Sequence, residues 1–310
     1  MRLVVALGGN ALSPAKGDGS VEEMRTSLAA AADVLASLVA DGHSLVLTHG
    51  NGPQVGRLLL QQERAAEVVP PMPMDVCGAL SQGQLGYLVA QALDNALRRR
   101  RLSARVLTLV TQVVVDGRSA AFRRPSKPVG PSYERPEAQG IAHSSGHVFA
   151  IQPDGRWRRV VASPKPLRFV EEGPLRALVD SGHVVVAAGG GGVPVVEHRG
   201  QLHGVEAVVD KDRTAALLAQ VVGADQLLVL TEAPQVAIGY GTPQQRVLDS
   251  MTVAEATAWL KAGEFPEGSM GPKVEACVTF VKAGGQAAIG ALSDAAAVLR
   301  GEAGTRIIPG

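Results

Sequence analysis

This chain of 310 residues has few of the features that point to membranes, metals or nucleic acids. Its only two cysteines, Cys77 and Cys277, lie far apart and lack metal-ligand spacing, so we expect reduced core thiols in a cytoplasmic protein and no metal held by side chains. No apolar run approaches the roughly 18 residues of a membrane span, and the run at the start is too short for a signal peptide. Lys and Arg number 30 against 29 Asp and Glu, a balance that predicts neither a nucleic-acid nor a membrane partner.

Lysine is scarce as well, since only seven of the 30 basic side chains are lysines. Four of them, Lys127, Lys165, Lys211 and Lys273, lie beside Pro, Gly, Asp or Ser, which are typical of loops. Where a chain that prefers arginine keeps lysine, a compact and flexible ammonium group can be what the position requires. Exposed lysines in surface loops are the plainer alternative for Lys127 and Lys165.

Neither common nucleotide-binding fingerprint is present, because the chain has no Walker A lysine and no GxGxxG motif. Instead, apolar runs at residues 3–7, 44–48 and 184–188, typical of buried parallel strands, each end in a glycine-rich loop. Glycine lets a phosphate approach backbone N–H groups closely. We therefore predict substrate and phosphate binding by Gly8, Gly9, Asn10, Gly50, Asn51, Gly52, Gly190 and Gly191. Ordinary strand-exit turns, or a linker at the glycine run, are the alternative.

Strand and helix signals alternate along the chain. Further strands are predicted at residues 106–115, 226–230, 287–291 and 305–308, and helices at 21–40, 55–63, 214–222 and 274–283, with one more that residues 82–87 lead into and that runs to 101. Thr252 and Glu255 form a capping-box pattern ahead of another helix. This order is the βαβ pattern, which predicts an α/β fold whose ligands bind beyond the carboxyl ends of the strands.

The amino-acid composition changes between residues 116 and 166, where Pro, Gly, Ser and Arg are frequent and helical periodicity is poor. Phe122, Tyr133, Phe149 and Trp157, a large share of the chain's few aromatic side chains, also fall here. A stretch this long without clear helices, within an otherwise regular βα chain, predicts a small inserted subdomain rather than a loop.

Asp210, Lys211 and Asp212 place three charges between an apolar run and an amphipathic one. Charges this close need a partner, a ligand or water. Phosphoryl transfer uses such groups, with fixed positive charge on the migrating phosphoryl group and fixed negative charge to orient the donors. The alternative is an exposed turn in which Asp212 is the N-cap of a helix.

Lys273 lies just before the predicted helix 274–283. The helix macrodipole disfavours a cation at this end unless an anion shares the site. The position of Lys273 therefore predicts a phosphate nearby.

Several segments, in this order, resemble the carbamate kinases of the amino-acid kinase superfamily. They are residues 5–11 (VALGGNA), 49–56 (HGNGPQVG), 109–116 (LVTQVVVD), 127–131 (KPVGP), 163–166 (SPKP), 189–194 (GGGGVP), 205–212 (VEAVVDKD) and 268–276 (GSMGPKVEA). The resemblance covers nearly the whole chain. Gly-Gly-Asn and the glycine run are shared across the superfamily, whereas HGNGPQVG, KPVGP and DKD together are specific to carbamate kinases.

The resemblance implies a three-layer αβα sandwich with an open, mainly parallel sheet, formed by one domain of residues 1–310 that dimerises. Residues 1–200 would bind carbamate or carbamoyl phosphate, with residues 117–166 as a protruding subdomain, and residues 201–310 would bind ATP or ADP. The implied reaction is reversible phosphoryl transfer between ATP with carbamate and ADP with carbamoyl phosphate, with Mg²⁺ accompanying the nucleotide. The implied direction is ATP formation, in arginine or ureide breakdown.

The resemblance also implies roles for individual residues. Lys211 resembles the family's central lysine on the transferred phosphoryl group, Lys127 the lysine presented by the subdomain, and Lys273 the lysine facing the nucleotide phosphates. Asp212 resembles the aspartate that orients these lysines. Nucleotide contacts are implied for Thr231, Glu232, Tyr240, Met270 and Lys273. Glu232 and Ala233 depart from the family's usual Asp-Val, and Tyr240 could stack a base or simply pack.

Two other functions are compatible with the sequence. A related amino-acid kinase acting on a carboxylate acceptor, such as acetylglutamate or aspartate, would need an arginine fork in the first-half cleft. The nearest candidate, Arg57, falls within a predicted helix. A nucleotide-binding regulator without turnover would have no need of Lys127, Lys211, Asp212 and Lys273.

Overall fold

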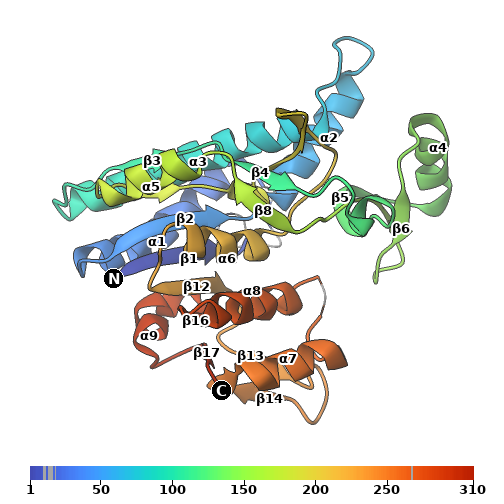
Figure 1. Cartoon of the computed structure of the whole chain (residues 1–310). Helices are drawn as coiled ribbons and strands as arrows, with labels where there is room; N and C mark the ends of the chain where they lie inside the picture. The colour runs from blue at the N-terminus through green and yellow to red at the C-terminus, as the bar shows by residue number, and fades with distance from the viewer. Residues whose placement is uncertain (10–11, 13–16, 18, 267) are drawn as a thin grey trace.

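An eight-stranded sheet of order β15-β17-β16-β12-β1-β2-β9-β3 forms the centre of the computed structural model, which describes residues 1–9, 12, 17, 19–266 and 268–310 (Figure 1). The strands are β1 (Arg2–Leu7), β2 (Ser44–His49), β3 (Val106–Thr108), β9 (Val184–Val186), β12 (Gln226–Thr231), β15 (Ser250–Thr252), β16 (Gln286–Ala291) and β17 (Thr305–Ile308). Neighbouring strands are parallel except β16 and β17, which are antiparallel. The predicted α/β fold with an open, mainly parallel sheet is thereby confirmed.

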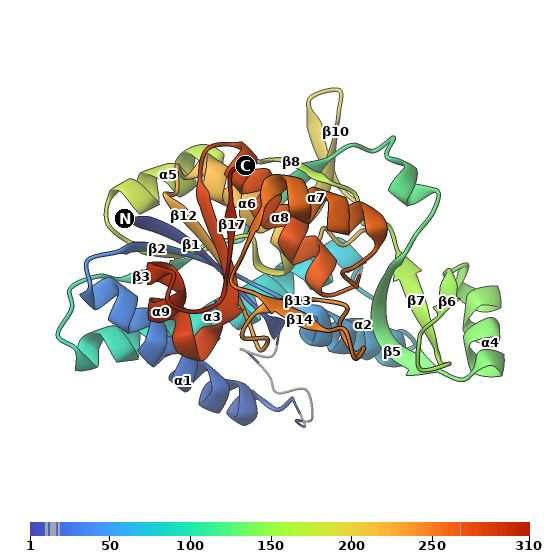
Figure 2. The ribbon, with the colours of Figure 1, turned by 90° about the horizontal axis from the view of Figure 1, so that it is seen from below.

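Helices cover both faces of this sheet. They are α1 (Val21–Ala40), α3 (Met74–Arg99) and α9 (Ala295–Arg300) on one face, and α5 (Glu172–Asp180), α6 (Lys211–Val221), α7 (Val253–Ala262) and α8 (Met270–Lys282) on the other (Figure 2). Leu3, Val5 and Leu7 of β1 belong to the apolar core shared with α1, α3 and α9. Val4 and Ala6 belong to the core shared with α5, α6, α7 and α8. Because successive side chains of a strand face opposite sides, an apolar run such as β1 can be buried on both faces, between two helical layers.

The prediction of a single strand over residues 106–115 is wrong, because the segment divides between two sheets. After β3 comes β4 (Gln112–Val115), which belongs to a four-stranded sheet of order β11-β10-β4-β8, with β8 (Pro166–Phe169), β10 (Val193–His198) and β11 (Gln201–Gly204). Between β3 and β4, the Thr111 N–H donates to Gln82 Oε1 at 2.9 Å, and the Thr111 carbonyl accepts from Gln82 Nε2 at 3.2 Å. A buried side-chain amide of α3 thus satisfies the backbone where the strand breaks.

Helix α3 begins at Met74, well before residues 82–87, which were predicted to lead into it. The helix packs closely at Gly86, where a Cβ would lie 2.1 Å from Thr108 Cγ2. Glycine therefore lets α3 approach β3 of the same chain more closely than any other residue would allow.

The subdomain, by which we mean residues 117–166, projects from the main body beside α2 (Gly52–Ala65), as Figure 1 and Figure 2 show. It contains an antiparallel sheet of order β5-β7-β6, with β5 (Lys127–Tyr133), β6 (Phe149–Ile151) and β7 (Trp157–Val161), and the helix α4 (Arg135–Ser145). The sequence predicted no clear helix here. Only Ala138 of α4 is buried, so the helix has no apolar stripe that periodicity could detect.

The subdomain is tied to segment 205–210, which connects β11 to α6. Val208 N–H donates to the Ala162 carbonyl at 2.9 Å, and Ala162 and Ala207 form an isolated parallel bridge. The Arg159 guanidinium pairs with the carboxylate of Glu206. The chain that leads into α6 therefore runs along the base of the subdomain.

The last third of the chain carries a short antiparallel pair, β13 (Val236–Ile238) and β14 (Arg246–Leu248), with Tyr240 in the loop between them. The predicted capping box of Thr252 and Glu255 is confirmed at the start of α7. Within the described ranges, no helix combines the length and apolar character needed to cross a bilayer.

Candidate active site

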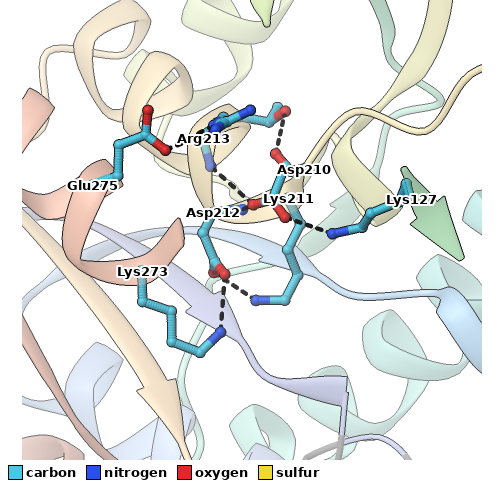
Figure 3. Close-up of polar contacts among 8 residues, drawn as sticks. Lys127, Asp210, Lys211, Asp212, Arg213, Lys273 and Glu275 are labelled. Carbon is cyan, nitrogen blue, oxygen red and sulfur yellow. Dashed lines mark hydrogen bonds and ion pairs between the residues drawn. The ribbon is translucent and has the colours of Figure 1, made fainter. Parts of the chain in front are cut away.

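The centre of the site is a carboxylate held between two ammonium groups (Figure 3). Asp212, in the first turn of α6, is buried, with Oδ1 2.6 Å from Lys211 Nζ and Oδ2 2.9 Å from Lys273 Nζ. Lys273 comes from the start of α8, so the first turns of two helices meet here. One carboxylate neutralises only one of the two lysines, and the excess positive charge at two helix N-termini favours an anion.

Asp210 caps α6 and also holds the third lysine of the site. Its Oδ1 accepts from the N–H groups of Asp212 at 3.0 Å and Arg213 at 3.5 Å, and its Oδ2 lies 2.7 Å from Lys127 Nζ (Figure 3). The alternative in which Asp212 is the N-cap is therefore wrong, because Asp210 fills that position. Asp212 is thereby left to pair with lysines.

Burial and charge compete in setting the pKa values of this cluster. Burial lowers the pKa of Lys211, the nearby Lys273 lowers it further, and Asp212 opposes both. Burial alone would raise the pKa of Asp212, but Lys211 and Lys273 outweigh it, so that pKa lies below its usual value. The Asp212 carboxylate is consequently ionised at neutral pH.

A pocket of about 230 Å³ opens beside this cluster. Of the predicted substrate and catalytic residues, it is lined by Gly9, Gly50, Asn51, Gly52, Gly190, Lys127, Lys211, Asp212 and Lys273. Gly8 lies just outside the lining, where its N–H donates to Leu230. Asn10 lies outside the described residues. Loops that end β1, β2 and β9 thus meet the N-termini of α6 and α8 at one edge of the sheet, as the βαβ pattern predicted.

Glycine at two loop positions brings the walls of the site together. A Cβ at Gly50 would lie 3.4 Å from Lys211 Cδ, so the lysine stem passes directly over this loop. Gly191 has φ +95°, and a Cβ there would lie 2.1 Å from the Val209 carbonyl oxygen. This backbone conformation and this close approach together restrict position 191 to glycine.

His49, at the end of β2, is buried and structural. Its Nδ1 donates to the Gly50 carbonyl at 2.9 Å, and its ring packs against Gly189. Burial lowers its pKa to about 4, opposed by the Gly50 hydrogen bond and assisted by Lys211. The ring is therefore neutral at physiological pH.

The residues predicted to bind nucleotide are less closely grouped. Lys273 lines the pocket, whereas Thr231 ends β12 and Met270 begins α8 without lining it. Glu232 is exposed, and Tyr240 is 72% exposed in the β13–β14 loop. Base contacts by these residues stay a prediction.

A larger cavity of about 650 Å³ adjoins the pocket and lies between the subdomain and helices α7 and α8. Lys127, Pro128, Asp210, Gly268 and Pro272 border both. The Lys127–Asp210 pair therefore stands where the two spaces meet.

The roles of two polar residues of the site were not predicted from the sequence. The N-cap role of Asp210 could have been found, since Asp is a favoured N-cap and stands immediately before α6. Ser81 of α3, which binds Asn51, gave no local signal, because its partner is 30 residues away in the chain.

Mg²⁺ does not fit a site built by protein side chains alone. The described residues contain no group of three His, Cys, Asp or Glu side chains able to hold a metal. Both oxygens of Asp210 and of Asp212 already accept from protein donors. An ion entering this site would be held by phosphate oxygens and water, the usual mode for Mg²⁺ at nucleotide sites.

Comparison with known proteins places these features in a family. A model of the amino acid kinase family matches residues 1–289. The carbamate kinase of Pyrococcus horikoshii is 45% identical, with 99% of each chain covered, and that of Halobacterium salinarum is 46% identical over 99% of this chain and 98% of its own.

Solved structures agree. Carbamate kinase from Giardia lamblia bound to AMP-PNP has a TM-score of 0.93 and 41% identity, covering 100% of this chain and 98% of its own. A structure from Aeropyrum pernix K1 has a TM-score of 0.95 and 43% identity, with both chains fully covered. The chain therefore belongs to the amino acid kinase family, and within it to the carbamate kinases.

Proposed function

We propose that the protein transfers a phosphoryl group reversibly between carbamoyl phosphate and ADP, giving carbamate and ATP, and that ATP formation is its physiological direction. The observation that carries this proposal is the convergence of Lys127, Lys211 and Lys273 on one pocket, where Asp210 pairs with the first and Asp212 with the other two. The Giardia relative binds an ATP analogue, AMP-PNP, which supports ATP and ADP as the nucleotides here.

Direct transfer needs positioning and positive charge more than a protein nucleophile. Lys211, held by Asp212 and stretched over Gly50, is placed to contact the migrating phosphoryl group. Lys273 would neutralise the nucleotide phosphates and Lys127 the phosphate of the carbamoyl donor. Asp212 orients two of these lysines and so fixes where developing charge is stabilised.

The carbamoyl group would occupy the side of the pocket formed by Gly50, Asn51 and Gly52. Asn51 is the N-cap residue of α2, yet its side chain does not cap the helix. The first-turn N–H groups of α2 therefore remain available to oxygen atoms of the substrate. We place the nucleotide on the side of β12 and α8, with Mg²⁺ carried by its phosphates, where the ion would neutralise their charge.

We further propose a cytoplasmic homodimer. Val76, Leu80 and Tyr87 of α3 are 38%, 42% and 55% exposed. Their spacing places them on one helix face, which a second copy of the chain could cover. Both cysteines are buried and free, as is usual in a reducing compartment.

The test is ATP formation from ADP, Mg²⁺ and carbamoyl phosphate by the purified protein, beside Lys211→Ala. We expect activity that falls by at least about a hundredfold in the variant. A wild-type protein that binds ADP without turning over carbamoyl phosphate would contradict the proposal. Acetylglutamate and aspartate with ATP serve as negative controls, since the Arg57 guanidinium donates to the Gly19 carbonyl and does not line the pocket.

A further inference from the structure

Asn51 lines the pocket, and the orientation of its side chain is set by a hydrogen bond to a residue outside the pocket lining. Asparagine at an N-cap usually accepts from first-turn N–H groups. Here its Nδ2 instead donates to Ser81 Oγ at 2.7 Å, across from α2 to α3. Ser81 is fully buried, so this contact is shielded from water.

The hydrogen bonds of Ser81 decide which end of the Asn51 amide faces it. Ser81 Oγ also lies 2.7 Å from the carbonyl oxygen of Gly78. Two oxygens at this distance need a hydrogen between them, and a carbonyl has none, so Ser81 donates its only proton to Gly78. Ser81 can then only accept from Asn51, which must present its NH₂ group.

The Asn51 oxygen consequently points away from Ser81. Within the described ranges, the only enclosed side-chain nitrogen or oxygen atoms without a partner are Nδ1 of His43 and of His147. Asn51 Oδ1 is not among them, and no described residue donates to it, so its open side is the pocket that Asn51 lines. The pocket therefore contains an acceptor among many donors.

We propose that Asn51 Oδ1 accepts a hydrogen bond from the amino group of the carbamoyl substrate, and that Ser81 is the positioning residue that keeps this oxygen turned toward it. The sequence predicted that Asn51 binds the substrate, and the hydrogen bonds of Ser81 identify its side-chain oxygen as the group that faces the pocket. This assignment rests on the proposed function and adds to it a basis for choosing a carbamoyl phosphate over an acyl phosphate.

The choice follows from the one group in which these substrates differ. Acetyl phosphate carries a methyl group where carbamoyl phosphate carries NH₂. A methyl group against Asn51 Oδ1 leaves a desolvated oxygen unpaired, and sites built to hydrogen-bond a substrate group discriminate strongly against analogues that lack it.

The experiment measures kcat/KM for ATP formation from carbamoyl phosphate and from acetyl phosphate, with ADP and Mg²⁺. We expect Ser81→Ala to lower the ratio of the two values about tenfold, because the freed amide can turn its NH₂ toward the substrate. Asn51→Ala should lower the ratio at least as far. The double variant should show no further loss, since Ser81 acts through Asn51.

Cys77→Ala is the matched control, one turn earlier in α3, equally buried and outside the pocket. It should leave the ratio unchanged. A Ser81→Ala variant that loses activity toward both substrates by the same factor would show a merely structural role and overturn the proposal. If Ser81→Ala does not fold, an unchanged ratio in Asn51→Ala overturns it equally.

Failure of this proposal is separable from failure of the proposed function. Wild-type turnover of carbamoyl phosphate with a ratio insensitive to both substitutions leaves the reaction intact and removes only the Asn51 assignment. Absence of wild-type turnover with carbamoyl phosphate overturns both.

Discussion

Lys127 of the subdomain and Asp210 at the start of α6 are joined by a contact of 2.7 Å between Nζ and Oδ2. The two residues are 83 positions apart in the chain. Asp210 thus serves α6 with one oxygen and the subdomain with the other. These two roles can be separated by substitution.

Asp210→Asn should retain the N-cap, because Asn caps helices as well as Asp does. It removes the charge that holds Lys127, so we expect kcat to fall about tenfold through misplacement of that lysine. KM for carbamoyl phosphate should not rise, because the pocket loses a negative charge. Asp210→Ala should in addition lower the free energy of unfolding by about 1 kcal/mol, measured by urea denaturation. Equal destabilisation by both variants would contradict the separation of roles.

Lys211→Arg keeps the positive charge but should still lower kcat by about a hundredfold. The lysine stem lies 3.4 Å from the position of a Cβ on Gly50, which leaves little space for a planar guanidinium. Steady-state ATP formation measures the effect, and Lys282→Arg, exposed in the last turn of α8, is the control. Near-normal turnover in Lys211→Arg would mean that charge alone suffices.

His49 should make the protein sensitive to mild acid. Its pKa in the folded protein is about 4, below the ordinary 6.5, so between these pH values the unfolded chain binds a proton that the folded protein does not. Stability due to this group is therefore complete above pH 6.5 and falls as the pH drops toward 4, by up to about 3 kcal/mol.

Urea denaturation from pH 7 to pH 4.5 measures this loss. His49→Asn, which can keep the donor to Gly50, should flatten the dependence on pH, whereas His143→Asn at an exposed position should not. Asp212 contributes separately, at lower pH, because its depressed pKa gives stability that is lost only below the usual range of a carboxyl group.

Neither thiol should react in the native protein. Cys77 and Cys277 are both fully buried, and burial raises the pKa of each, so little thiolate forms. Titration with a chromogenic disulfide should find no fast-reacting thiol under native conditions and two after denaturation. One fast thiol in the folded protein would indicate local opening around that cysteine.

Local patterns in the sequence were sufficient for much of the fold. The apolar runs of β1 and β2 and the amphipathic α1 have the predicted positions. Burial on both faces makes a strand apolar throughout, burial of one face gives a helix its apolar period, and both patterns can be recognised within a short segment. The capping box of Thr252 and Glu255 was predictable because both partners are three residues apart.

Hydrogen bonds between residues far apart in the sequence were not predictable. The break at Thr111 depends on Gln82, and the orientation of Asn51 depends on Ser81. Each pair is about 30 residues apart, and neither follows a period or a turn rule. The motifs located Lys211, Asp212 and Lys273, but their pairing geometry required the fold.

The base of the subdomain has a mechanical consequence. Segment 205–210 is attached to it at three successive levels, through Glu206, Val208 and Asp210. The last of these residues caps α6, so a tilt of the subdomain would be transmitted directly to the first turn of that helix. Motion that opens or narrows the pocket cannot then be independent of where the Lys211 ammonium is aimed.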